Sequence, residues 1–287
     1  MITTVESDCI KFYNKITGEY INEIDERNVK QIKFEPDGNF FITVSHFSTK
    51  LKIWDVAILE VMWEIENSEE IACFDINSEG TQIVTICRKC KIWNFETRDL
   101  IYSSPFLSGF YINYVYFNPV ENKLLYQTSN RILSVIDLNT IEIINILIID
   151  YIKYFCYSPD GSKIAIVTDT SICIKETDTY KTIFEIKLNK DIQVSFSFSP
   201  CSSMFIYSLG NEIYLYDALT FRLIKQIELD ICIKYLSFTS SGIFICTKSN
   251  KLIKYNDMLE LLDFEIDCVY AWNNKCFSIQ PDIGNYI

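Results

Sequence analysis

The stretch VKQIKFEPDGNFFITVSHFSTKLKIWDVAILEVMWEI, residues 29–65, carries the pattern that decides the fold. Four short runs in which apolar and polar residues tend to alternate lie at 29–34, 40–44, 50–54 and 60–65. The first two runs are separated by Glu35-Pro-Asp-Gly38, a composition typical of tight turns. Alternation with a period of two predicts half-buried strands, so we expect four consecutive antiparallel β-strands here.

The same unit recurs along the whole chain. Each copy has an apolar anchor just before its first turn, and successive anchors are 42, 41, 40, 41 and 40 residues apart. One seventh of the 287 residues is 41, so the length accommodates seven units. Self-similarity at a fixed period indicates a repeat architecture. The anchors are Phe34, Ile76, Phe117, Tyr157, Phe198 and Phe238.

A second signal ends the third run of each unit. An acidic or amide residue stands there and, in five of seven copies, a threonine follows three residues later. An Asp or Asn side chain can accept backbone N–H groups two or three residues on, and the threonine hydroxyl closes the same loop. We therefore predict a tight strand-to-strand turn in each copy. The candidate structural residues are Trp54, Asp55, Trp93, Asn94, Asp137, Thr140, Asp217 and Thr220.

Four strands in each unit of about 41 residues, with Trp54-Asp55 ending the third, resemble the WD40 repeat family. The resemblance in spacing covers essentially the whole chain, although the Gly-His dipeptide of typical members is absent. It implies an all-β fold, a seven-bladed β-propeller of four-stranded antiparallel blades, formed by residues 1–287 as a single domain. It also implies a non-catalytic scaffold for protein–protein interaction.

The two ends of the chain are expected to close the ring by sharing one blade. Closure removes the unpaired strand edges that would otherwise aggregate. Residues 1–25 and about 267–287 would form this blade, with the innermost strand coming from the C-terminus. Two C-terminal registers remain open, because 279–282 mimics the Pro-Asp turn while 268–272 and 276–280 together read as a hairpin.

Composition narrows the functional classes. The chain has 26 Lys and Arg residues against 38 Asp and Glu residues, a formal net charge of −12. Nucleic-acid affinity comes mainly from neutralising phosphates, so this balance disfavours nucleic acid as the primary ligand. The N-terminus has no signal-peptide pattern and no apolar run approaches the roughly 20 residues of a membrane span. We therefore expect a cytoplasmic or nuclear protein whose cysteines are thiols.

Catalytic and metal-binding motifs are weak. His46 is the sole histidine and lies in a predicted loop, where a surface role is the simplest interpretation. Cys87-Arg-Lys-Cys90 is the one C-x-x-C pair, without the second pair that structural zinc usually needs. We expect no catalytic residue, cofactor or metal. The alternative is a propeller enzyme that uses channel carboxylates and a divalent metal.

The loops expected on one face of the propeller are the usual docking surface of the family that this chain resembles. Glu66, Glu69 and Glu70 belong to an acidic loop set that would attract a basic partner segment, unless such charges merely pair with their neighbours. The longest connection carries Phe106, Leu107, Phe110 and Tyr111, which would anchor a protein or peptide partner or fold back over the adjacent blade.

The run at 141–149 would be an outermost strand, yet both of its faces are apolar. Edge strands of soluble monomers normally present polar residues outward. Ile144 and Ile146 therefore predict that the rim of blade three is covered by a partner or by a second copy. The alternative is the general richness of this chain in isoleucine, and the sequence leaves the oligomeric state open.

Overall fold

The structure is a computed structural model that describes residues 2–5, 8–14, 17–104, 114–129, 131–149, 151–188, 193–249, 251–267 and 277–279. All regular elements in these ranges are β-strands. The fold is a β-propeller of four-stranded antiparallel blades, as the repeat pattern predicts. The chain divides into two compact units, unit 1 with residues 1–34 and 190–287 and unit 2 with residues 35–189.

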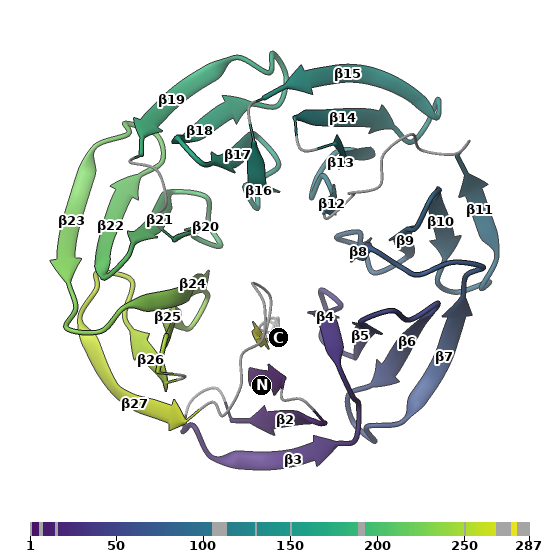
Figure 1. Cartoon of the computed structure of the whole chain (residues 1–287), viewed down its shortest axis with the longest axis horizontal. Coiled ribbons are helices and arrows are strands. Elements are labelled where there is room, and N and C mark those ends of the chain that lie inside the picture. Colours follow the sequence, from purple (N-terminus) through teal and green to yellow (C-terminus); the bar gives the residue numbers. More distant parts are fainter. Residues whose placement is uncertain are drawn as a thin grey trace, which may run out of the picture. The chain divides into compact units, whose positions relative to one another are not determined.

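Unit 2 contains the strands β5 to β19. The sheets that lie wholly within it have the orders β11-β10-β9-β8, β12-β13-β14-β15 and β16-β17-β18-β19. In Figure 1, β15 and β19 form the outer border of this unit, and β12 and β16 lie at the opposite edges of their sheets. The strands are β5 (Phe40–Ser45), β6 (Lys50–Asp55), β7 (Val61–Glu66), β8 (Cys73–Ile76), β9 (Gln82–Ile86), β10 (Cys90–Asn94), β11 (Leu100–Ser103), β12 (Val115–Phe117), β13 (Lys123–Ser129), β14 (Ile132–Asp137), β15 (Glu142–Ile148), β16 (Ile152–Tyr157), β17 (Lys163–Thr168), β18 (Ser171–Glu176) and β19 (Thr182–Lys187).

Unit 1 contains the remaining strands. Two of its sheets have the orders β20-β21-β22-β23 and β24-β25-β26-β27. The strands are β1 (Ile2–Val5), β2 (Ile10–Tyr13), β3 (Tyr20–Ile24), β4 (Val29–Phe34), β20 (Val194–Phe198), β21 (Met204–Leu209), β22 (Glu212–Asp217), β23 (Leu223–Glu228), β24 (Ile233–Thr239), β25 (Gly242–Thr247), β26 (Lys251–Tyr255), β27 (Leu261–Asp267) and β28 (Phe277–Ile279).

Strands from both ends of the chain meet in a third sheet of unit 1, with the order β28-β1-β2-β3. Ile2 pairs with Ile279 and Thr3 with Ser278 in antiparallel register. Strand β28 falls within 276–280, which is the second run of the predicted C-terminal hairpin. The residues at 268–276 and 280–287, which the two registers also involve, lie outside the described residues.

The buried core is divided into layers between adjacent sheets. In unit 2, Leu51 and Ile53 of β6 pack with Phe74 and Ile83 of the next sheet. Leu133 belongs to another layer, between the β12–β15 sheet and the β16–β19 sheet. Strand side chains point alternately to the two faces of a sheet, so a blade with a neighbour on each side contributes apolar residues to two layers.

Hydrogen bonds between adjacent blades repeat the period of the sequence. The Asp75 carboxylate accepts the backbone N–H of Phe117, 42 residues later, at 2.8 Å. In unit 1, the Ser195 hydroxyl accepts the N–H of Leu236, 41 residues later, at 3.0 Å. Each bond gives a partner to a buried backbone N–H on the first strand of a sheet. Such a group would cost free energy if it were buried without a hydrogen bond. The 41-residue repeat is thus also the register in which neighbouring blades contact one another.

The turn after each third strand is built on its acidic or amide residue. The Asp137 carboxylate accepts the N–H groups of Asn139 and Thr140 at 2.8 and 3.3 Å. The corresponding carboxylate of Asp217 accepts the N–H of Thr220 at 2.7 Å and its hydroxyl at 2.9 Å. In the turn at Asn256 the residue with a positive φ is Leu259, three residues on, and in the other described turns it is the fourth residue after the acidic or amide residue. This position is occupied by Gly18, Leu59, Arg98, Ile141, Tyr180 and Phe221.

The two tryptophans of the motif are held in the same way. The indole N–H of Trp54 donates to the Thr43 hydroxyl at 2.8 Å, and that of Trp93 donates to the Thr85 hydroxyl at 3.0 Å. Each indole N–H is therefore hydrogen-bonded to a threonine on the second strand of the same sheet. Asp55 and Asn94, which follow them, accept N–H groups within their turns.

Candidate interaction surfaces

Four of the predicted interaction residues belong to the longest connection. Phe106, Leu107, Phe110 and Tyr111 lie at 105–113, outside the described residues. The other predicted interaction residues, Glu66, Glu69, Glu70, Ile144 and Ile146, are all described and belong to unit 2. They fall on two surfaces of this unit, one at the loop after β7 and one on β15.

Two of the three predicted acidic residues are engaged locally. Oε1 of Glu69 lies 3.6 Å from Nε of Arg88, and Oε2 accepts the Arg88 backbone N–H at 3.3 Å. The Glu70 carboxylate accepts the backbone N–H of Phe47 at 3.3 Å. These contacts tie the loop after β7 to the neighbouring loops. Charge pairing between neighbours thus accounts for part of the acidic pattern.

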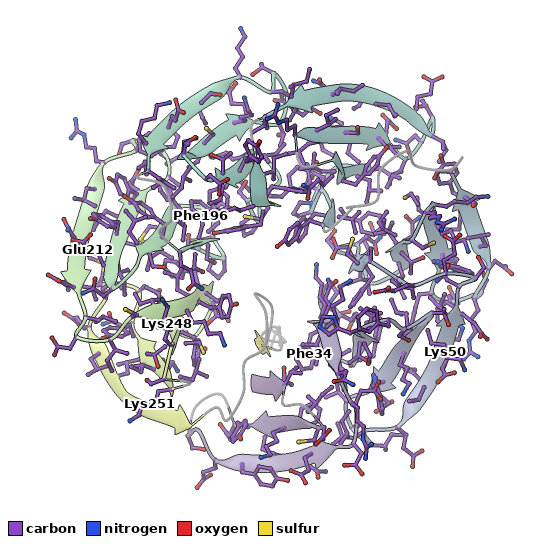
Figure 2. The ribbon with its side chains drawn as sticks, in the orientation of Figure 1. Phe34, Lys50, Phe196, Glu212, Lys248 and Lys251 are labelled. Carbon is purple, nitrogen blue, oxygen red and sulfur yellow. The ribbon has the colours of Figure 1, made fainter. Side chains whose placement is uncertain are left out.

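Glu66 ends β7 beside a surface ion pair. Lys50 of β6 donates to the Glu64 carboxylate at 2.9 Å. This hydrogen bond, followed by the negative charges of Glu64 and Glu66, raises the pKa of the Lys50 ammonium above its ordinary value of 10.5. Lys50 is labelled in Figure 2, in the part of unit 2 formed by β6 and β7. The exposed face of these two strands is therefore charged.

Phe47 is the most exposed large hydrophobic side chain in the described residues, at 84% of its full area. It lies in the loop 46–49 between β5 and β6, here called the Phe47 loop, and its φ is 60°. Besides the Glu70 contact, the Ser48 N–H donates to Ser45 O at 3.2 Å and the Ile71 N–H donates to Ser48 O at 2.9 Å. The backbone around Phe47 is thus fixed while its ring points into solvent.

Sequence reasoning placed His46 in this loop and overlooked its neighbour Phe47. The signal that could have found it is a large aromatic residue in a polar connection between a second and a third strand. His46 is half-buried, and its ring centroid lies 6.1 Å from that of Phe47.

The second surface, here called the β15 rim, consists of Ile143, Ile144, Ile146 and Ile148 of β15 with Tyr151 just after it. All five side chains are exposed, Ile146 at 56% and Ile148 at 82%. Asn145 and Leu147 alternate with them and are half-buried. The alternation of an edge strand is therefore present, but its solvent side carries isoleucine.

Ile144 occupies a bulge position that recurs in the outer strands and is not a peculiarity of β15. Ile144 is skipped in the pairing with β14, because Ile143 pairs with Ile136 and Asn145 with Val135. Every outer strand from β3 to β23 has such a bulge, and each time the skipped residue is large and apolar. The skipped residues are Ile21, Met62, Ile101, Ile144, Ile183 and Ile224.

Strand β15 differs from the other outer strands at the outward-pointing positions that follow the bulge. Strand β7 has Glu64 and Glu66 there, β19 has Glu185 and Lys187, and β23 has Gln226 and Glu228. Strand β15 has Ile146 and Ile148. A uniform excess of isoleucine would not leave the same positions charged or polar in the other strands. The distinctive part of the rim is thus Ile146, which the sequence singled out, and Ile148, which it did not.

The C-x-x-C pair sits at the start of β10 in a largely apolar setting. Cys90 is fully buried, and burial raises the pKa of its thiol well above the ordinary value. A raised pKa keeps the sulfur protonated and unreactive at neutral pH. Among the described residues, no group of three or more His, Cys, Asp and Glu side chains is placed to hold a metal ion.

In the described part of the chain, no helix is long and apolar enough to cross a membrane. Comparison with protein-family models and with curated proteins finds no match to this sequence.

Proposed function

We propose that this chain is a non-catalytic, WD40-like scaffold that binds a protein or peptide segment through the loops around Phe47. The proposal takes the blades to be seven, closed into one ring and one domain by the sheet that both chain ends share. It places the protein in the cytoplasm or nucleus. The observation that carries the binding function is an almost fully exposed aromatic ring on a fixed loop.

A rigid aromatic side chain is the kind of group that contributes most to protein interfaces. Phe47 loses little conformational freedom on binding, because its loop is already held by Glu70 and by the backbone bonds of Ser48. Its positive φ costs roughly 1–2 kcal/mol for a residue other than glycine. The backbone of this loop holds a large apolar ring in water, which supports a role in binding.

The chemistry around the Phe47 loop favours a partner segment with basic residues. Glu66 and Glu70 are exposed, and Glu70 lies next to Phe47 through its hydrogen bond. The chain as a whole carries a net charge of −12, which would steer a basic segment toward it. We propose an apolar residue against Phe47, flanked by Lys or Arg near the two carboxylates.

The test is affinity purification of the intact protein beside its Phe47→Gly variant. Glycine removes the ring and also relieves the positive φ, so this variant should be at least as stable as the wild type. Partners bound through Phe47 should be retained about 30-fold less, as expected for an interface anchor worth about 2 kcal/mol. Circular dichroism melting of the same samples checks folding.

Val120→Gly is the matched control, because Val120 is also a strongly exposed apolar residue in a loop of unit 2. It should leave partner retention unchanged. An identical set and amount of retained proteins with wild type and Phe47→Gly would reject the Phe47 loop as the binding surface. A Phe106→Ala/Phe110→Ala variant, run in parallel, tests the predicted anchors of the longest connection.

The propeller enzyme with channel carboxylates and a divalent metal stays the alternative. No observation on the described residues favours it. Retention of a divalent metal after purification, lost when acidic residues of the channel are replaced, would support it instead.

A further inference from the structure

We propose that the β15 rim is the interface of a homodimer, in which two copies of the chain pack their rims antiparallel about a two-fold axis. The rim lies apart from the Phe47 loop in the sequence, and the inference does not depend on the proposed binding function. It rests on three observations: the apolar outward positions, an occupied edge N–H and the uncharged neighbouring strand.

The outward positions of β15 expose an apolar surface that water solvates poorly. Ile144, Ile146 and Ile148 point to the same side of the strand, and Tyr151 follows at its end. Stable interfaces bury at least about 1,000 Å² in total, and a strip of four isoleucines and one tyrosine from each copy is close to this lower limit. We therefore expect a weak dimer, with a Kd of about 10 μM.

Side-chain packing, rather than a continuous β-ladder, forms the contact. Strand β15 is the last strand of its sheet. The outward N–H of Ile146 already donates to the side chain of Asn145, at 2.7 Å. A partner strand that added to this edge would have to displace that bond. Packing of isoleucine against isoleucine leaves it in place.

The strand beneath the rim adds no charge to this surface. Ile146 pairs with Ser134 of β14 and Ile148 pairs with Ile132. At the same places in the β6–β7 pair, Lys52 lies opposite Glu64 and Lys50 opposite Glu66. Packing β15 against another apolar surface therefore desolvates no charged group in the centre of the contact.

Strand β15 and the turn after it define the two ends of the rim. Glu142, exposed, begins β15. At the other end, Arg131 holds the last turn of the rim, because its carbonyl accepts the Ile149 N–H at 2.8 Å and its guanidinium lies 4.7 Å from the Tyr151 ring centroid. With Ile146 on the axis, antiparallel packing brings Ile144 to the partner subunit's Ile148.

The contact between Ile144 and the partner subunit's Ile148 occurs twice, because the interface is isologous. Like charges would oppose self-packing of the β7 rim, where Glu64 and Glu66 would face the same carboxylates of a second copy. Strand β15 is thus the outer strand of unit 2 whose outward centre suits a second copy of the chain.

The first experiment is sedimentation velocity of the whole chain from 1 to 100 μM. We expect the average mass to rise with concentration from 33.6 kDa toward twice that value. The Ile146→Glu/Ile148→Glu variant should raise the dimer Kd at least about 100-fold, because it places four carboxylates in one apolar contact. Val61→Glu/Met62→Glu, at exposed apolar positions of β7, is the matched control and should dimerise like the wild type.

The second experiment tests the two-fold geometry by placing charges at the facing positions. Ile144→Lys and Ile148→Glu should each raise the dimer Kd at least about 10-fold, because each buries a charge against an isoleucine of the partner subunit. The double variant Ile144→Lys/Ile148→Glu should dimerise more tightly than either single variant, because opposite charges then meet at both facing pairs. An Ile146→Thr/Ile148→Thr variant provides a milder change of the rim, should the glutamate variant fail to fold.

A monomer at every concentration would overturn the proposal, and so would an unchanged Kd in both rim variants. A double variant Ile144→Lys/Ile148→Glu that dimerises no better than the single variants would overturn the antiparallel arrangement. A different protein captured through the rim by monomeric wild type would also reject the second copy as occupant. Phe47→Gly should dimerise normally, so failure of the loop proposal and failure of the dimer proposal are separable.

Discussion

The hairpins β6–β7 and β14–β15 of unit 2 share one backbone design. In both, an aspartate accepts N–H groups two and three residues on, from Ala57 and Ile58 at Asp55 and from Asn139 and Thr140 at Asp137. In both, the fourth residue after the aspartate has a positive φ, and the outer strand carries a bulge at the seventh residue after the aspartate. The inward leucines Leu51 and Leu133 are fully buried.

Only the outward residues separate the two hairpins. The β6–β7 face carries Lys50, Lys52, Glu64 and Glu66, and the β14–β15 face carries Ile132, Ser134, Ile146 and Ile148. Since the backbone is the same, the outward residues are not needed to make a blade. The inward residues and the turn specify the fold, and the outward residues are free to specify what the blade contacts.

The largest effect is expected where the two hairpins are alike. Leu51→Ala and Leu133→Ala should each lower the free energy of unfolding by about 3 kcal/mol, because each leaves a cavity in a layer between blades. Chemical unfolding followed by circular dichroism measures both, in the Ile146→Glu/Ile148→Glu background so that self-association does not contribute. Losses that differ by more than about 2 kcal/mol would contradict an equivalent interior.

A smaller effect of opposite sign is expected at the turns. Ile141 has a φ of 61° and Leu59 a φ of 57°, in the left-handed region that favours glycine. Ile141→Gly should raise the free energy of unfolding by about 1 kcal/mol, and Leu59→Gly by less, because branching at Cβ adds to the strain. Thermal unfolding gives the order of the two. Gly18→Ala, at the equivalent turn of unit 1, should destabilise, and a stabilised Gly18→Ala variant would contradict the common turn geometry.

The sequence predicts the features that both hairpins share. The 41-residue spacing, the period-two runs and the Asp or Asn turn residues all follow from local chemistry, and the strands found at 29–34, 40–45, 50–55 and 61–66 are within two residues of those expected. The positive φ at Leu59 and Ile141 was not predictable, because neither residue type favours it. It is imposed by the backbone bonds from these N–H groups to Asp55 and Asp137.

The surfaces were predictable only in part. Because of the bulge, the set of β15 side chains that point outward shifts by one residue. An uninterrupted run of apolar residues in the sequence does not reveal this shift. The run therefore pointed to Ile144, which resembles its counterparts in the other blades, and missed Ile148. The exposure of Phe47 was not predictable, because it depends on the conformation of a single loop residue. The number of blades and the partner remain predictions.

The smallest effect is expected on the charged hairpin alone. Hydrogen bonding to Glu64 raises the pKa of Lys50 in the folded chain above its ordinary value of 10.5. Its contribution to stability is therefore fully present below pH 10.5 and is lost as the pH rises through the folded pKa. Lys50→Met should lower the unfolding midpoint slightly at pH 8, and the gap to wild type should close at the alkaline end of a titration. Ile132→Met, at the equivalent position of β14, should show no such pH dependence. A gap for Lys50→Met that stays constant with pH would mean that the lysine stem, rather than its charge, supports β7.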